Sequence, residues 1–493
     1  MMNLKWLLTL LLLLALAACG GGGGGGGSSD NTTTTVGDNN DGTDPNGEST
    51  GDDGGISGDS IDISKLNSVT TDLNEITYPN SYQKPTLDTS DVNADICNLD
   101  VGVVTFSRDW LGSYPLPEIK GAPLQSKISR GATIRDIMLD DNPSFIVGCQ
   151  GNLKKEFVRI LERFTVLGVE VVYIPQWHWM SKKDDESWYV VPAENTFGPL
   201  SDTNLQYFAD LATARGMQLV MLNQIQGFVD DFESPAYVPE YTVENLAKWF
   251  EANQDFVAER SVFFESIGVD IWEVGCSVCL FAPYKARNQD EMDLYAQEYE
   301  KNIDTIKKNF SGKILIYDNL DIKQYPSLLG KIDVLATSLN VSTYSTTEMD
   351  DLSVDNLKAK FLDSNLYQID QLQSIGKPIL FSLGMQSRGN ALTEPGYLEE
   401  TGCTSEFGSL DAGNEKDICL QKEVNTDFSI QAIFMEAAME FLNEQNFTKN
   451  PIVMVNDYWV TDSIIPTNVF PNISLSFRNK PAEGIVKAWF ARE

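Results

Sequence analysis

The chain has 493 residues, 42% of them hydrophobic, which is enough for one large folded domain or for two to three ordinary ones. It carries 71 acidic and 36 basic residues, and the resulting formal charge of −35 repels nucleic acid and anionic lipid headgroups. We therefore exclude nucleic acid as a partner, and we exclude a membrane as a partner except through a covalently attached lipid.

The chain begins with a targeting signal. Lys5 precedes the apolar run 6-WLLTLLLLLAL-16, which is too short to span a bilayer as a mature helix. The run continues into LAAC, which resembles the lipobox of bacterial lipoproteins and implies cleavage before Cys19 and acylation of that residue. An ordinary signal peptide with an incidental cysteine is the alternative. Gly20 replaces the aspartate that retains such proteins in the inner membrane, so we expect a lipid-anchored protein on the bacterial outer membrane, at the cell surface.

Three regions follow from composition. Residues 1–18 form the signal peptide, and residues 19–96 form a linker that is rich in Gly, Ser, Thr and Asp. Up to about Gly58 this linker has almost no apolar residues, so burial cannot offset the entropy of ordering it, and we expect it to be flexible. Residues 97–493 form the folded domain.

The cysteines of the folded domain are predicted to form structural disulfides, because an exported protein folds in an oxidising compartment. Cys276 and Cys279 form a CxxC motif, but the chain has no second such motif and only one histidine, so we expect no zinc site. We expect no metal and no cofactor. Proximity in sequence favours the pairs 97–149, 276–279 and 403–419.

Short runs rich in Val and Ile alternate with longer amphipathic segments from Cys97 onward, a pattern typical of strand–helix repeats around a parallel sheet. Eight such repeats predict an α/β fold, a (β/α)8 or TIM barrel. A doubly wound open sheet is the alternative, but 106-FSRDWLGSYP-115 lacks the Gly-rich phosphate turn usual after its first strand. The predicted strands are 101–106, 169–175, 218–223, 269–274, 313–318, 332–338, 377–383 and 452–457. Gly168, Gly216, Gly268 and Gly376 are predicted to end helices just before strands.

In TIM barrels the functional residues lie at the C-terminal ends of the strands. Five of the nine tryptophans fall there, among amides and acids. This mixture suits sugars, whose C–H faces stack on aromatic rings while their hydroxyl groups need hydrogen-bond partners. The candidate substrate-binding residues are Asp109, Trp110, Trp177, His178, Trp179, Asn223, Asn319, Asn456, Tyr458 and Trp459.

Several segments resemble clan A glycoside hydrolases, most closely the endo-beta-mannanase-like barrels. The resemblance rests on the spacing of residues 196–223, 245–275 and 477–490, and it extends over most of residues 100–490. It implies a retaining mechanism with two carboxylates about 5 Å apart, one on the fourth strand and one on the seventh.

Both catalytic positions depart from the pattern of this clan. The fourth strand should end in Asn-Glu, but Cys276 and Ser277 stand there. The seventh strand runs into 381-FSLGMQSR-388, which contains no acid, and Leu383 is the nearest counterpart of the second glutamate. Neither Ser nor Leu can protonate a leaving group, so the catalytic roles do not carry over.

Other acids could replace the missing pair. Glu273 shares the strand parity of Ser277 but lies four residues deeper, so we interpret it as a core carboxylate. Asp318 and Asp457 end the fifth and eighth predicted strands and are the candidate catalytic residues of a relocated pair.

Two functions stay open. The first is a surface-tethered lipoprotein that binds a polysaccharide or oligosaccharide without cleaving it. The second is an active glycoside hydrolase with relocated carboxylates. A structural or adhesive lipoprotein without a sugar ligand would leave the aromatic residues at the strand ends unexplained.

Overall fold

The computed structural model describes residues 112–135, 153–182, 187–192, 200–229, 240–275, 281–317, 321–393, 427–459 and 475–491, with short gaps at 282, 340, 342–343 and 479. The signal peptide, the linker, all cysteines and the predicted strand 101–106 lie outside these residues. In the described part of the chain, no helix is long and apolar enough to cross a membrane.

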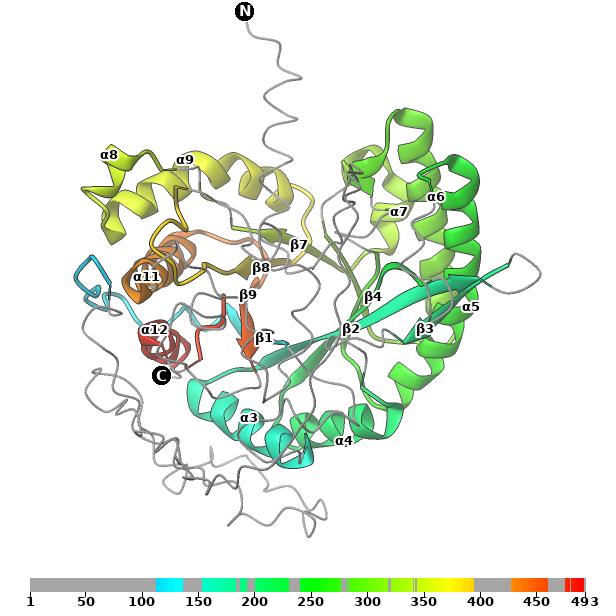
Figure 1. The fold of residues 1–493 in the computed structure, drawn as a ribbon, viewed down its shortest axis with the longest axis horizontal. Helices are drawn as coiled ribbons and strands as arrows, with labels where there is room; N and C mark the ends of the chain where they lie inside the picture. The colour runs from blue at the N-terminus through cyan, green and yellow to red at the C-terminus, as the bar shows by residue number, and fades with distance from the viewer. Residues whose placement is uncertain are drawn as a thin grey trace, which may run out of the picture.

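Eight parallel strands close into a barrel, and the helices form a ring around it (Figure 1). Each strand pairs with the next along the chain, and β9 pairs with β1 to close the ring. The predicted (β/α)8 barrel is thereby confirmed. The barrel strands are β1 (Ser129–Arg135), β2 (Val171–Lys182), β4 (Gln218–Val229), β5 (Ile271–Glu273), β6 (Lys313–Tyr317), β7 (Val334–Ser338), β8 (Ile379–Leu383) and β9 (Ile452–Trp459).

The helices cover the outer face of the strands. The predicted helix ends at Gly168, Gly216, Gly268 and Gly376 are confirmed, because all four glycines have φ between 69° and 81°. A residue with a side chain is strained in that left-handed conformation, and glycine is not. The helices are α3 (Leu153–Leu167), α4 (Asp202–Thr213), α5 (Val243–Ser266), α6 (Gln289–Ile306), α7 (Pro326–Lys331), α8 (Thr346–Met349), α9 (Val354–Gln373), α11 (Phe428–Glu444) and α12 (Pro481–Phe490).

Two apolar layers hold the barrel together. The larger layer lies between the strands and the helices. The smaller one fills the inside of the barrel and includes Val171, Val220, Leu315 and Met454. Because side chains from alternate positions of every strand meet there, the inside is a packed core and not a pore.

The first barrel strand differs from the prediction. Seven of the predicted strands coincide with barrel strands, but the ring closes through β1 at residues 129–135 and not through residues 101–106. The sequence of this strand, SRGATIR, did not predict a strand, because it contains Arg130, Gly131 and Arg135 and has no apolar run. A Cβ atom at Gly131 would lie 2.6 Å from the methyl group of Met454, so the packed interior requires glycine at this place.

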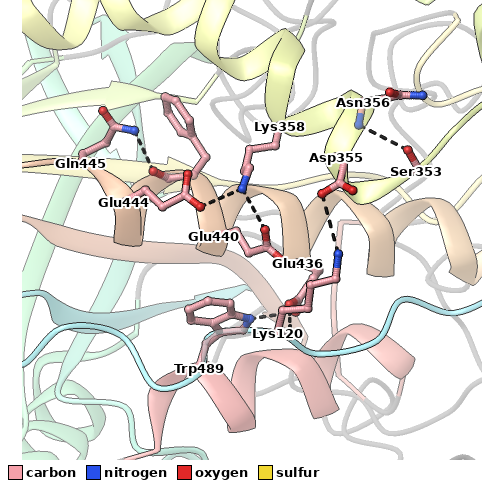
Figure 2. A network of polar contacts seen from close by, with 11 residues as sticks. Lys120, Ser353, Asp355, Asn356, Lys358, Glu436, Glu440, Glu444, Gln445 and Trp489 are labelled. Atoms are coloured by element: carbon pink, nitrogen blue, oxygen red, sulfur yellow. Dashed lines mark hydrogen bonds and ion pairs between the residues drawn. The ribbon is translucent and has the colours of Figure 1, made fainter.

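Residues 112–128 run along α11 before they enter β1. The amide of Ser113 donates to Asp427 at the start of α11, and the amide of Leu124 donates to the carbonyl of Trp489 in α12. Midway, the Glu436 carboxylate accepts hydrogen bonds from the Lys120 amide and from the indole of Trp489, both at 2.8 Å (Figure 2). These contacts fasten the entry of the described chain to the last helices of the ring.

A salt-bridge network joins α9 to α11 beside this segment. Lys358 on α9 lies 3.1 Å from Glu440 and 2.7 Å from Glu444 on α11, as Figure 2 shows. The same helix face carries Asp355, which lies 3.7 Å from Lys120. Ion pairs with an exposed partner, such as Lys358–Glu444 and Lys120–Asp355, contribute little individually to stability. Glu440 is the buried member of the network.

Two barrel strands continue beyond the barrel wall. β2 pairs with β1 only as far as Tyr173, yet its pairing with β4 continues to Ser181 and Val229. β3 (Trp188–Pro192) then pairs with the end of β2 in antiparallel fashion. We call these three segments, residues 177–182, 188–192 and 224–229, the sheet extension.

Candidate functional site

The C-terminal ends of the strands form the mouth of the barrel. Trp179 and Tyr317 are half-buried there, and both pack against the inner core. Around them the ends of neighbouring strands contribute small polar side chains. Described residues at this end whose strand positions face inward include Thr133, Trp179, Tyr317, Ser338, Ser382 and Asn456.

Asn456 is held in place at the mouth. Its amide nitrogen donates to the Ser382 hydroxyl at 2.6 Å, and the Ser382 hydroxyl lies 3.0 Å from its amide oxygen. Gly384 lies close beside it, because a Cβ at Gly384 would be 3.3 Å from the Asn456 side chain. The contact ties β8 to β9 just below the mouth, where Asn456 and Ser382 are 7% and 3% exposed.

Glu273 lies deeper, inside the barrel. Its strand neighbours in register are Leu222 on β4 and Leu315 on β6, and the Tyr173 hydroxyl donates a hydrogen bond to its carboxyl group. Burial in this apolar setting raises the pKa of Glu273 to about 8, although the hydrogen bond from Tyr173 opposes the shift. The group is therefore protonated at neutral pH, which agrees with the interpretation of Glu273 as a core carboxyl group.

His178 lies on the outer side of the barrel wall. Its ring packs edge-on against Phe256 of α5, with the ring centres 4.6 Å apart, and its Nδ1 is 3.2 Å from the carbonyl of Gln176. Burial, and then the nearby charge of Arg260, lower the pKa of His178 to about 3. The structure thus places His178, predicted as a sugar ligand at the mouth, between a strand and a helix and away from the mouth.

Asn223 also points away from the mouth. It lines a cavity of about 30 Å³ between the strands and the helices, together with Trp249 and Asn302. Both polar atoms of its amide are buried and have no hydrogen-bond partner among the described residues. A water molecule needs about 10–15 Å³ of such space, so the cavity has room to hydrate this amide. The structure thus places Asn223, also predicted as a sugar ligand, away from the mouth.

Tyr458 is turned outward by an irregularity in β9. Ala132 of β1 pairs with Val455, whereas Ile134 pairs with Tyr458, so β9 contains one extra residue. The Tyr458 ring packs against Phe164 of α3 at 4.9 Å, and its hydroxyl donates to Glu483 of α12 at 3.2 Å. Tyr458 therefore belongs to the contact between the first and last helices and not to the mouth.

The remaining candidates are placed only in part. Trp177, Asp457 and Trp459 lie at the ends of β2 and β9, but the structure describes only their backbone. Asp109, Trp110, Asp318 and Asn319 lie outside the described residues, and so do Cys276 and Ser277. Because the first strand is β1, Asp109 and Trp110 do not follow the first strand of the barrel, contrary to prediction.

The expected second catalytic position is also displaced. Leu383 is fully buried in the layer between strands and helices, so it does not face the inside of the barrel. At this height the inward side chain of β8 is Ser382, which bonds to Asn456. Among the described side chains that line the barrel, Glu273 is the one carboxyl group. No group of three or more His, Cys, Asp or Glu side chains in the described ranges could hold a metal ion.

No protein-family model and no curated protein matches the chain. The closed ring of parallel strands makes the chain a TIM barrel. Several solved structures are similar to it. Similar barrels include a GH113 beta-1,4-mannanase, at 13% identity and a TM-score of 0.46 over 75% of this chain and 99% of that one. A GH113 beta-mannanase from Alicyclobacillus acidocaldarius in complex with ManMIm has 13% identity and a TM-score of 0.43, over 75% and 98% of the two chains. A fungal beta-1,4-galactanase has 12% identity and a TM-score of 0.37, over 68% and 89%. The likeness is one of fold.

Sequence reasoning missed four residues at the mouth of this TIM barrel, one of them Thr133 on the unpredicted strand β1. Tyr317 follows Leu315 by two positions on β6, and Ser338 and Ser382 hold equivalent inward positions on β7 and β8. The alternation of side chains along a strand contained this signal, because residues two apart face the same side.

Proposed function

We propose that the protein binds a polysaccharide at the mouth of its barrel and does not cleave it. One observation carries this proposal. The described mouth presents the aromatic rings of Trp179 and Tyr317 beside hydroxyl and amide groups, whereas the one carboxyl group among the described lining residues is buried and protonated.

Such a mouth suits binding better than hydrolysis. A retaining glycosidase needs two carboxyl groups about 5 Å apart, one as acid and one as nucleophile. Glu273 is hydrogen-bonded by Tyr173 and enclosed by leucines, so it is not available to a substrate in the mouth. Aromatic rings with fixed polar neighbours need no ionised group to hold a sugar ring.

The net charge of −35 favours an uncharged polymer over an anionic one. Barrels of similar fold are a beta-1,4-mannanase and a beta-1,4-galactanase by name. Linear β-1,4-linked mannan and galactan are therefore the first polysaccharides to test.

The deciding experiment measures retention and cleavage in parallel. Full-length protein is run through gels that contain mannan, galactan or other polysaccharides, and each mixture is assayed for new reducing ends. We expect retardation without release of reducing sugar. If sugar is released, and if Asp318→Asn or Asp457→Asn abolishes the release while the fold persists, the relocated-carboxylate hydrolase replaces this proposal.

We also propose that the mature chain is held at the outer membrane through a lipid on Cys19. The lipobox-like LAAC supports this proposal. Cys19→Ser is expected to move the protein from the membrane fraction to the soluble fraction after detergent-free washing, because each buried CH₂ of an acyl chain contributes about 0.8 kcal/mol to anchoring. A variant that stays in the membrane fraction would show that the anchor is elsewhere.

A further inference from the structure

We propose that the sheet extension is a second sugar-binding surface, which holds a polysaccharide chain where it leaves the mouth of the barrel. This proposal rests on the proposed function. It adds where the bound polysaccharide lies after it leaves the mouth and in which direction it runs. The surface is built from the ends of β2 and β4 and from β3, and so it projects beyond the barrel wall (Figure 1).

One face of the extension continues the lining of the barrel. Trp179 packs against the inner core, which fixes the side of β2 that faces the mouth. Ser181 is two residues further along and faces the same side. Across the antiparallel pairing, Val191 lies opposite Trp179 and Tyr189 lies opposite Ser181. Trp179 and Tyr189 are therefore diagonal neighbours on one face, with a separation of about 7–8 Å.

The strand neighbours of Trp179 on this face are Val191 of β3 and Gly227 of β4, which stand in register with it. Ser181 follows Trp179 by two residues and lies opposite Tyr189. Trp179 is half-buried and Tyr189 is 37% exposed. The face thus carries two aromatic rings as diagonal neighbours, with the hydroxyl group of Ser181 opposite Tyr189.

The opposite face of the extension is packed. His178 lies against Phe256 of α5, and Trp188 lies 6.2 Å from Phe281, ring centre to ring centre. Met180, on the same side, is fully buried. This face of the extension therefore packs against helix α5. Burial of His178 in this contact explains why it is neutral.

A linear chain of uncharged pyranose units fits this face. Each ring has C–H faces that stack on an indole or a phenol, and its hydroxyl groups can bond to Ser181. Two aromatic rings in sequence along one face suit successive units of one chain, whereas a single sugar would need only the mouth. The strongly negative protein disfavours an anionic chain at the same place.

The test compares a short and a long oligosaccharide. Affinity of the full chain is measured by titration calorimetry for β-1,4-linked mannobiose and mannohexaose and for the galactan equivalents. Tyr189→Ala is expected to weaken hexaose binding about tenfold, within the range for truncated aromatic anchors, and to leave biose binding unchanged. Trp179→Ala should weaken both, and Tyr189→Phe should retain wild-type affinity for both.

Tyr367→Ala is the matched control, because Tyr367 is a 77% exposed tyrosine on α9, away from the extension. Thermal unfolding checks that every variant is folded. Unchanged hexaose affinity in Tyr189→Ala, or an equal loss for biose and hexaose, overturns the second surface and leaves the proposed function standing. If the wild-type protein binds neither series and no polysaccharide in the gel panel, the surface and the proposed function fail together.

Discussion

Replacing Arg163 by methionine is expected to lower the free energy of unfolding by about 3–5 kcal/mol. Arg163 of α3 holds Glu483 of α12 through two hydrogen bonds of 2.7 Å, and their side chains are only 11% and 3% exposed. Removal of the guanidinium leaves a buried carboxylate without its principal counter-charge, and the stem of methionine restores the volume but not the charge. Chemical denaturation at neutral pH measures the loss.

A double-mutant cycle separates this pair from simple packing. Glu483→Gln alone should also destabilise the protein, because it leaves the buried guanidinium unmatched, whereas the double variant should lose much less than the sum of the two. Lys248→Met is the control, since Lys248 and its partner Glu244 are 40% and 79% exposed and exposed pairs contribute about 0–1 kcal/mol. If the losses of Arg163→Met and Glu483→Gln simply add, the pair does not fasten the two ends of the barrel.

The barrel was predictable because its signals are local. Seven of the eight barrel strands contain an apolar run, and the glycines at 168, 216, 268 and 376 mark helix ends where a left-handed residue is needed. β1 gave no such signal. Gly131 of β1 leaves space for the side chain of Met454, which is more than 300 positions away in the sequence. No local sequence pattern reveals that contact.

The side that each candidate faces was less predictable. His178 lies between two tryptophans in sequence, and alternation along β2 alone puts it on the opposite face from Trp179, against α5. Tyr458 is the reverse case, because alternation from Met454 predicts an inward side chain and the extra residue in β9 turns it outward. A bulge depends on how two distant strands pair, so it cannot be read from one strand.

The proposal that the mouth binds without cleaving also depends on which side of a strand each residue faces. The pattern of clan A glycoside hydrolases requires a carboxylate on the inward side of β8, but the inward residue there is Ser382. Leu383 packs in the layer between the strands and the helices. Leu383→Glu would therefore bury a charge among apolar side chains instead of rebuilding a nucleophile. The described mouth contains hydroxyl and amide groups, and the one carboxyl group among the described lining residues, Glu273, lies deeper.

Glu273→Gln is expected to stabilise the protein at pH 8 and to have little effect near pH 4.5. In the unfolded chain the Glu273 carboxyl group loses its proton above its ordinary pKa of 4.5, whereas burial holds the folded-state pKa at about 8. Folding between these values takes up a proton, so the contribution of Glu273 to stability is complete below pH 4.5 and is lost as pH rises towards 8. The slope is about 1.4 kcal/mol per pH unit. Glutamine is neutral at every pH and can still accept the hydrogen bond from Tyr173, so it removes this loss.

The measurement is the difference in unfolding free energy between wild type and Glu273→Gln from pH 4.5 to 8.5. His178, whose folded pKa of about 3 makes the protein less stable as pH falls below 6.5, is common to both proteins and cancels in the difference. Tyr173→Phe is the control, since loss of the donor should raise the pKa of Glu273 and steepen the wild-type dependence at the alkaline end. A difference that stays constant with pH would mean that Glu273 is ionised in the folded barrel. The lining would then contain a charged carboxylate, and the case for binding without cleavage would lose its main support.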